Sequence, residues 1–176
     1  MRRHLVLFVR APQLGRGKRR LARAIGDVAA ARFERAMLAL LLRRLAGDRR
    51  WRLRLAVTPD TACRHARHWR RGVTVTGQGG GDVTCAECGD IAAAFRLLGG
   101  HDLVFGPAED GGFWLVGARR APRLPPLFER VRWSGPYALA DTLAGLPRRV
   151  SVGFVDRLED VDDSEAYRRL MPRRGF

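Results

Sequence analysis

The chain has 176 residues, which is enough for one domain with a substantial hydrophobic core. With 46% hydrophobic and 29% charged residues, its composition excludes a disordered chain. The net charge of +15 raises nucleic acid as a partner. Because the arginines are scattered through most segments, we expect no sequence-specific nucleic-acid binding.

Nothing in the sequence indicates export or membrane insertion. No apolar stretch reaches the length of a transmembrane helix, and the apolar run near residue 5 is shorter than that of a signal peptide. Three cysteines, an odd number, argue against a disulfide framework. We therefore expect a cytoplasmic protein.

Strand and helix patterns alternate along the chain. The first strand, 5–9, is apolar throughout, which is typical of a strand buried on both faces. In chain order the patterns predict strand 5–9, helix 28–45, strand 53–57, helix 61–71, strand 73–76, helix 91–98, strands 102–105 and 113–116, helix 139–143, strand 150–155 and helix 164–171. This order predicts a mostly parallel sheet covered by helices, in one α/β domain over 1–176.

A glycine-rich turn, GRGKRRLA at 15–22, follows the first strand and contains the single lysine of the chain. Ligands of open α/β sheets bind beyond the carboxyl ends of the strands. Gly15 and Gly17 let backbone N–H groups approach an anion, while Lys18 and Arg20 supply charge for phosphates. The turn matches neither the P-loop nor the GxGxxG pattern. From spacing alone, a solvated basic turn is an equal alternative.

Four segments together resemble the bacterial DUF2064 glycosyltransferase-like family, some of whose members are described as arsenosugar-biosynthesis glycosyltransferases. They are FVRAPQLGRGKRRLARAIG at 8–26, GPAEDGGFWLVG at 106–117, RWSGPYALADTL at 132–143 and LEDVDDSEAY at 158–167. This family is related to nucleotide-diphospho-sugar transferases and to nucleotidyltransferases of cofactor synthesis. The resemblance implies a three-layer α/β/α Rossmann-like fold with a mostly parallel sheet.

The resemblance also assigns roles to individual residues. The nucleotide would be bound by Ala11, Pro12, Gly15, Gly17, Lys18 and Arg20, and the substrate by Gly111, Gly112, Phe113 and Trp133. Relatives of this fold hold a divalent cation, Mg²⁺ or Mn²⁺, with carboxylates. Here the candidates are Asp110, Asp160 and Asp162, of which Asp110 and Asp162 would be catalytic. Phe113 or Trp114 would stack on a sugar or base.

The carboxylates also have structural interpretations. Asp110 precedes two glycines between two apolar strands, which is a hairpin signal. The acidic stretch 159–163 would favour the N-terminus of the last helix. The resembled family further has a helix, a strand and a TD-x-P turn after its GxGD loop. This chain passes from GQGGGD at 77–82 directly to VTCAECG, where Glu87 is the one possible replacement for the missing aspartate if 83–86 is a strand.

The resemblance therefore implies metal-assisted transfer of a glycosyl group from a nucleotide sugar to a small acceptor. One alternative is a nucleotidyltransferase that releases pyrophosphate from an NTP. A second is a degenerate nucleotide-binding protein without activity. A zinc site built from Cys63, His65, His68, Cys85 and Cys88 is less typical than incidental thiols, since only one CxxC pair is present.

Overall fold

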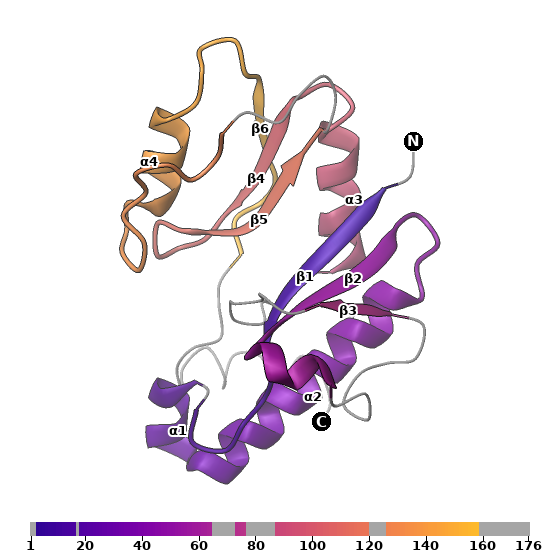
Figure 1. The fold of residues 1–176 in the computed structure, drawn as a ribbon, viewed down its shortest axis with the longest axis vertical. Coiled ribbons are helices and arrows are strands. Elements are labelled where there is room, and N and C mark those ends of the chain that lie inside the picture. Colours follow the sequence, from indigo (N-terminus) through magenta and orange to yellow (C-terminus); the bar gives the residue numbers. More distant parts are fainter. Residues whose placement is uncertain (1–2, 17, 65–72, 77–86, 120–125, 159–176) are drawn as a thin grey trace. The chain divides into compact units, whose positions relative to one another are not determined.

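The computed structural model describes residues 3–16, 18–64, 73–76, 87–119 and 126–158 (Figure 1). The described residues belong to two compact units, one within 1–85 and the other within 86–160. Each unit is described by itself below. The expectation of a single domain over 1–176 stays a prediction.

The first unit contains a parallel three-stranded sheet in the order β1-β2-β3. The strands are β1 (His4–Arg10), β2 (Arg52–Thr58) and β3 (Thr74–Thr76). In the β1–β2 register, His4 lies opposite Arg52 and Arg10 opposite Thr58. The predicted α/β class with parallel strands is confirmed, and each of these strands lies within a residue or two of its predicted range.

Two helices follow β1, and a glycine separates them. Helix α1 (Arg19–Ile25) ends at Gly26, whose φ of +85° is a conformation that suits glycine. Helix α2 (Asp27–Ala46) then begins and packs against the sheet (Figure 1). Its buried face is built from apolar side chains at helical spacing, which was the basis of the prediction for 28–45.

One expectation for β1 is wrong. Val6 and Phe8 are 44% and 52% exposed, so the strand is not buried on both faces. Successive side chains of a strand point to opposite faces, and Val9 on the alternate face is fully buried. An apolar run therefore did not distinguish a strand covered on one face from a strand covered on both.

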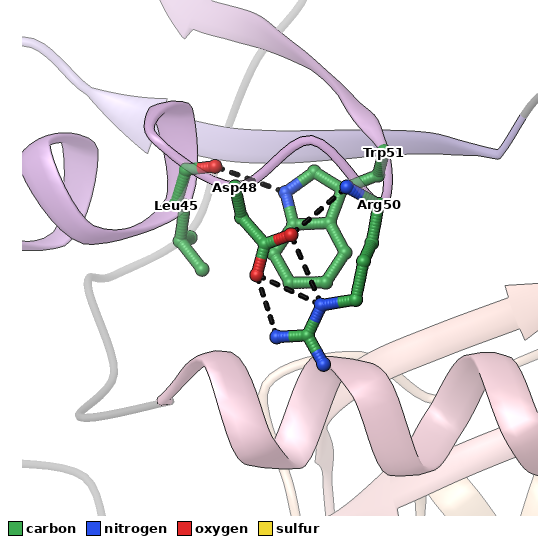
Figure 2. Close-up of polar contacts among 4 residues, drawn as sticks. All are labelled: Leu45, Asp48, Arg50 and Trp51. Carbon is green, nitrogen blue, oxygen red and sulfur yellow. Dashed lines mark hydrogen bonds and ion pairs between the residues drawn. The ribbon is translucent and has the colours of Figure 1, made fainter.

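The turn between α2 and β2 is closed by side chains (Figure 2). The Trp51 Nε1–H donates to the Leu45 carbonyl oxygen at 3.0 Å, and the Arg50 guanidinium lies 5.0 Å from the centre of the Trp51 ring. Asp48 accepts hydrogen bonds from the side chain and the backbone N–H of Arg50, which lower the pKa of its carboxyl. The helix predicted at 61–71 begins as a 3₁₀ helix over Asp60–Arg64, and its remainder lies outside the described residues.

The second unit contains a mixed sheet in the order β5-β4-β6. The central strand β4 (Leu103–Pro107) pairs antiparallel with β5 (Phe113–Ala118) and parallel with β6 (Val152–Phe154). Helix α3 (Cys88–Leu97) packs against β4 and β6, and helix α4 (Ala138–Ala144) follows β5 in the chain.

The core of this unit lies around β4, where three successive apolar side chains are fully buried: Leu103, Val104 and Phe105. Glycines let neighbours approach closely. A β-carbon on Gly117 would lie 3.1 Å from Leu98, and one on Gly153 would lie 2.8 Å from the His101 ring. The helix predicted at 164–171 lies outside the described residues. In the described part of the chain, none of the helices has the length and apolarity needed to cross a membrane.

Candidate functional site

The glycine-rich turn lies at the carboxyl end of β1. The Ala11 N–H donates to the Thr58 carbonyl oxygen at 2.8 Å, which extends the β1–β2 ladder by one residue. Beyond Pro12 the chain turns, with a hydrogen bond from the Arg16 N–H to the Gln13 carbonyl oxygen at 3.2 Å. The turn thus occupies the edge of a parallel sheet at which nucleotides bind in this class of fold.

Both ends of this turn are fixed in the core. Val9 precedes it and Leu21 follows it, and both side chains are fully buried. Leu21 packs in one cluster with Phe33 and Met37 of α2. Side chains held in the core therefore flank the turn on both sides.

The structure brings the predicted nucleotide-binding residues together in this one turn, except Gly17, which lies outside the described residues. Gly15 has a φ of +71°. Lys18, directly before α1, has a φ of +23°, which is rare for a residue with a side chain. Arg20 is exposed.

The second group of candidates lies in the β4–β5 hairpin. The Ala108 N–H donates to the Gly112 carbonyl oxygen at 3.1 Å, and the Gly112 N–H donates to Oδ1 of Asp110 at 2.9 Å. The hairpin interpretation of Asp-Gly-Gly is therefore confirmed. Asp110 is exposed, so its carboxylate is open to solvent while one oxygen stabilises the turn.

The hairpin contacts a second loop, 130–137, which we call the tryptophan loop. Gly111 has a φ of +84°, and a β-carbon on it would lie 2.7 Å from the Pro136 carbonyl carbon. The Gly111 carbonyl oxygen also accepts a hydrogen bond of 3.1 Å from the Leu139 N–H. The predicted substrate-binding residues Gly111 and Gly112 are thus next to the loop that carries Trp133.

Aromatic rings join the two segments. The Phe113 ring contacts the rings of Phe105, Phe128 and Trp133 at centroid distances of 5.6, 5.8 and 6.2 Å. Phe113 is half-buried, whereas Trp133 is 56% exposed. Of the predicted substrate-binding residues, Trp133 presents the larger free aromatic surface.

Trp114 has a structural role instead. Its Nε1–H donates to the Asp156 carbonyl oxygen at 3.1 Å, and its ring lies where a β-carbon on Gly106 would be. The expectation that Phe113 or Trp114 stacks on a sugar or base stays a prediction. Sequence spacing gave no means of ranking the three rings.

Sequence reasoning missed an ion pair that holds the tryptophan loop. Arg132 donates from Nε and Nη2 to the two carboxylate oxygens of Asp141, each at 2.8 Å, and its backbone N–H donates to the same carboxylate at 3.0 Å. The guanidinium also lies 4.0 Å from the centre of the Tyr137 ring. These bonds lower the pKa of Asp141 to about 2. The sequence did not reveal this ion pair, because a basic residue nine positions before an acidic residue is a common pattern.

The metal candidates are only partly described. Asp160 and Asp162 lie outside the described residues. Glu87 caps α3, where it forms a reciprocal capping box with Asp90, whose carboxylate accepts a 2.7 Å hydrogen bond from the Glu87 N–H. Among the described residues, no group of three or more His, Cys, Asp or Glu is positioned to hold a metal ion. The metal ligands stay a prediction.

The segment after β6 returns to the hairpin. Leu158 pairs with Ala108, and its N–H donates to the Pro107 carbonyl oxygen at 3.3 Å. The described chain thus ends two residues before Asp160, beside the turn of Asp110. Of the candidate zinc ligands, Cys88 is the first residue of α3, and His65, His68 and Cys85 lie outside the described residues.

Comparison with known proteins agrees with the expected family and fold. Residues 82–135 match the model of the family described as "Uncharacterized protein conserved in bacteria (DUF2064)". No curated protein is a significant match to the chain. A crystal structure from Desulfovibrio desulfuricans G20, described as a "putative nucleotide-diphospho-sugar transferase", is similar with a TM-score of 0.79 and 23% identity. The similarity covers 90% of this chain and 81% of that chain.

The family match includes the Asp110 hairpin and the first residues of the tryptophan loop, and the structural match includes nearly the whole chain. Residues 82–135 therefore match the family that the sequence resembles, and the chain has the same fold as the Desulfovibrio protein.

Proposed function

We propose that the protein transfers a sugar from a nucleotide-diphospho-sugar to a small acceptor with the help of Mg²⁺ or Mn²⁺. The observation that carries this proposal is the contact between the Asp110 hairpin and the tryptophan loop. It gathers an exposed carboxylate, a glycine backbone and an exposed indole ring in one unit.

The glycine-rich turn would bind the diphosphate. Its backbone is held between two buried side chains, and Lys18 and Arg20 stand at its end, before and within the first turn of α1. A lysine ammonium and an arginine guanidinium are complementary to phosphate oxygens. Binding the diphosphate there would fix the donor before the acceptor arrives.

The described residues provide some of the oxygen ligands that a hard divalent cation prefers. Asp110 uses Oδ1 to bind the Gly112 N–H, which leaves Oδ2 for a cation. Asp160 and Asp162, the other predicted ligands, lie outside the described residues. A bound cation would neutralise the charge of the departing diphosphate. Remaining ligands would come from the diphosphate oxygens.

Turnover assays test the proposal. Full-length protein is incubated with UDP-, GDP- and dTDP-sugars and Mn²⁺, with pools of small acceptors, and release of the nucleoside diphosphate is measured. We expect release that Asp110→Asn abolishes, because the amide keeps the hydrogen bond to Gly112 but loses the charge. The matched control is Glu109→Gln, which removes the neighbouring exposed carboxylate and is expected to keep activity.

Three other outcomes contradict the proposal. Release of pyrophosphate from an NTP would identify a nucleotidyltransferase instead. Nucleotide binding without release of either product, over the whole panel, would identify a binding protein. An Asp110→Asn variant that is as active as the unchanged protein would remove the hairpin from the site.

A further inference from the structure

The order of the strands in the first unit determines which face of its sheet the connecting helices cover. The chain passes from β1 to β2 and from β2 to β3, each time to a parallel neighbour and in the same direction. The first connection contains α2, and the second begins with η1 (Asp60–Arg64). Because such connections are right-handed, both are expected on the same face of the sheet. The opposite face receives no helix from these two connections.

The burial of the strand residues agrees with this order. Successive side chains of a strand point to opposite faces. On one face Val9, Leu55 and Val57 are fully buried. The other face, which we call the exposed sheet face, is formed by exposed side chains of all three strands: His4, Val6, Phe8, Arg10, Arg52, Arg54, Thr74 and Thr76. Parallel sheets are usually covered on both faces, so this face is expected to have a partner.

The chemistry of the exposed sheet face defines that partner. Val6 and Phe8 are 44% and 52% exposed and are neighbours on this face, about 7 Å apart along β1. In the register of the sheet, Arg54 lies opposite Val6, and Arg52 lies opposite His4. A complementary partner therefore has a short apolar stripe with an acidic group next to it.

A segment of this chain beyond the described residues has that composition. Residues 159–176 follow Leu158, the last described residue, and 159–165 reads EDVDDSE, with five carboxylates in a chain of net charge +15. Within and next to the helix predicted at 164–171, spacings of three and four residues place one acidic and four apolar residues on a single helix face: Asp163, Ala166, Tyr167, Leu170 and Met171. Arg168 and Arg169 fall on the opposite face of that helix.

We infer that the C-terminal segment 163–171 docks as a helix on the exposed sheet face. Its apolar stripe covers Val6 and Phe8, and Asp163 forms an ion pair with Arg54. The dimensions agree, because the four residues from Tyr167 to Met171 rise about 6 Å along a helix, close to the distance between Val6 and Phe8. Asp160 and Asp162, the predicted metal ligands, take no part in this contact. The inference does not depend on the proposed function.

Hydrogen exchange of the full chain, measured by mass spectrometry on peptic peptides, tests the inference. We expect Phe8→Ser to accelerate exchange of the amides of 164–171 about tenfold, because the helix loses part of the surface on which it docks. Exchange in β2 should stay the same, since Leu55 and Val57 are buried on the other face of the sheet. The matched control is Phe154→Ser, which removes a similarly exposed ring from the second unit and should leave exchange of 164–171 unchanged.

Charge reversal tests the ion pair separately. Arg54→Glu and Asp163→Arg should each accelerate exchange of 164–171 about threefold, and the double variant should restore the slower exchange, since the two charges are then exchanged between the partners. Arg35→Glu reverses an exposed cation on α2, away from the exposed sheet face, and should leave exchange of 164–171 unchanged. A double variant that exchanges as fast as Arg54→Glu alone would show that Asp163 and Arg54 are not partners.

The same variants identify a different partner if the inference is wrong. Exchange of 164–171 that is equal in Phe8→Ser and in the unchanged protein overturns the inference, whichever other segment responds. A second copy of the chain is the main alternative occupant of this face. In that case Phe8→Ser would convert a dimer into a monomer in light scattering and leave exchange of 164–171 unchanged. A monomer in both proteins, with faster exchange of 164–171 in Phe8→Ser, supports docking of the chain's own C-terminal segment.

Discussion

Gly111 lies against the backbone of Pro136 so closely that a β-carbon at residue 111 would be 2.7 Å from the Pro136 carbonyl carbon. With its φ of +84°, Gly111 is therefore required at this position for two independent reasons. The contact joins the hairpin that carries Asp110 to the loop that carries Trp133. The geometry of the candidate site in the second unit depends on this contact between Gly111 and Pro136.

Substitution of Gly111 is expected to be costly. Gly111→Ala should lower the free energy of unfolding by more than about 1–2 kcal/mol, since it combines a disfavoured φ with a backbone clash. Gly135→Ala is the matched control, because a β-carbon there meets no atom within 4 Å and its φ is not positive. Urea denaturation of both variants measures the difference. Equal stability of the two would mean that the hairpin and the tryptophan loop are not in contact.

The Arg132–Asp141 pair predicts a pH dependence. The pKa of Asp141 is lowered to about 2 from an ordinary value near 3.9, mainly by the side-chain hydrogen bonds from Arg132. Its stabilising contribution is therefore complete above about pH 4 and disappears as the pH falls through about 2. Asp141→Asn should lower the melting temperature by the same amount from pH 5 to 8, and by less near pH 2. A difference that instead changes between pH 5 and 8 would contradict the assigned ion pair.

A substitution of Lys18 tests whether its charge contributes to nucleotide binding. Lys18→Gly removes the ammonium group at a position whose φ of +23° glycine adopts without strain, and it should weaken nucleoside diphosphate binding about tenfold. Arg49→Ala removes an exposed cation from the turn before β2, at the opposite edge of the parallel sheet, and should have no effect on binding. Calorimetry on the unchanged protein and on the two variants measures the affinity of each for the nucleoside diphosphate. Equal losses in both variants would indicate only general attraction between phosphate and a basic protein.

Glu87 and Asp162 are expected to behave in opposite ways. Glu87 caps α3, so Glu87→Ala should lower the free energy of unfolding by about 1 kcal/mol and leave binding of nucleotide with Mn²⁺ unchanged. Asp162→Asn should leave stability unchanged and reduce the effect of Mn²⁺ on nucleotide affinity. Thermal denaturation and calorimetry on both variants give the comparison. A loss of the Mn²⁺ effect in Glu87→Ala would make Glu87 a metal ligand after all.

Local features were predictable from the sequence, and tertiary ones were not. The end of α2 at Gly47 and the hairpin at Asp110 follow from periodicity and from glycine, which act over a few residues. The exposure of Phe8 and the choice among Phe113, Trp114 and Trp133 depend on what packs against each ring. The Arg132–Asp141 pair depends on how a loop folds back onto α4, which no local pattern encodes. The resemblance predicted the fold because four motifs occur in the family's order.

Titration of the full chain with nucleoside diphosphates and nucleotide sugars, with and without Mn²⁺, tests the central claim most directly. Carboxylates on separate segments bind a divalent cation weakly unless a diphosphate supplies further oxygens. We therefore expect no measurable heat from Mn²⁺ alone, and tighter binding of at least one nucleotide sugar when Mn²⁺ is present. Nucleotide affinity that is the same with and without the cation would contradict a metal-assisted transferase and favour a protein that only binds nucleotides.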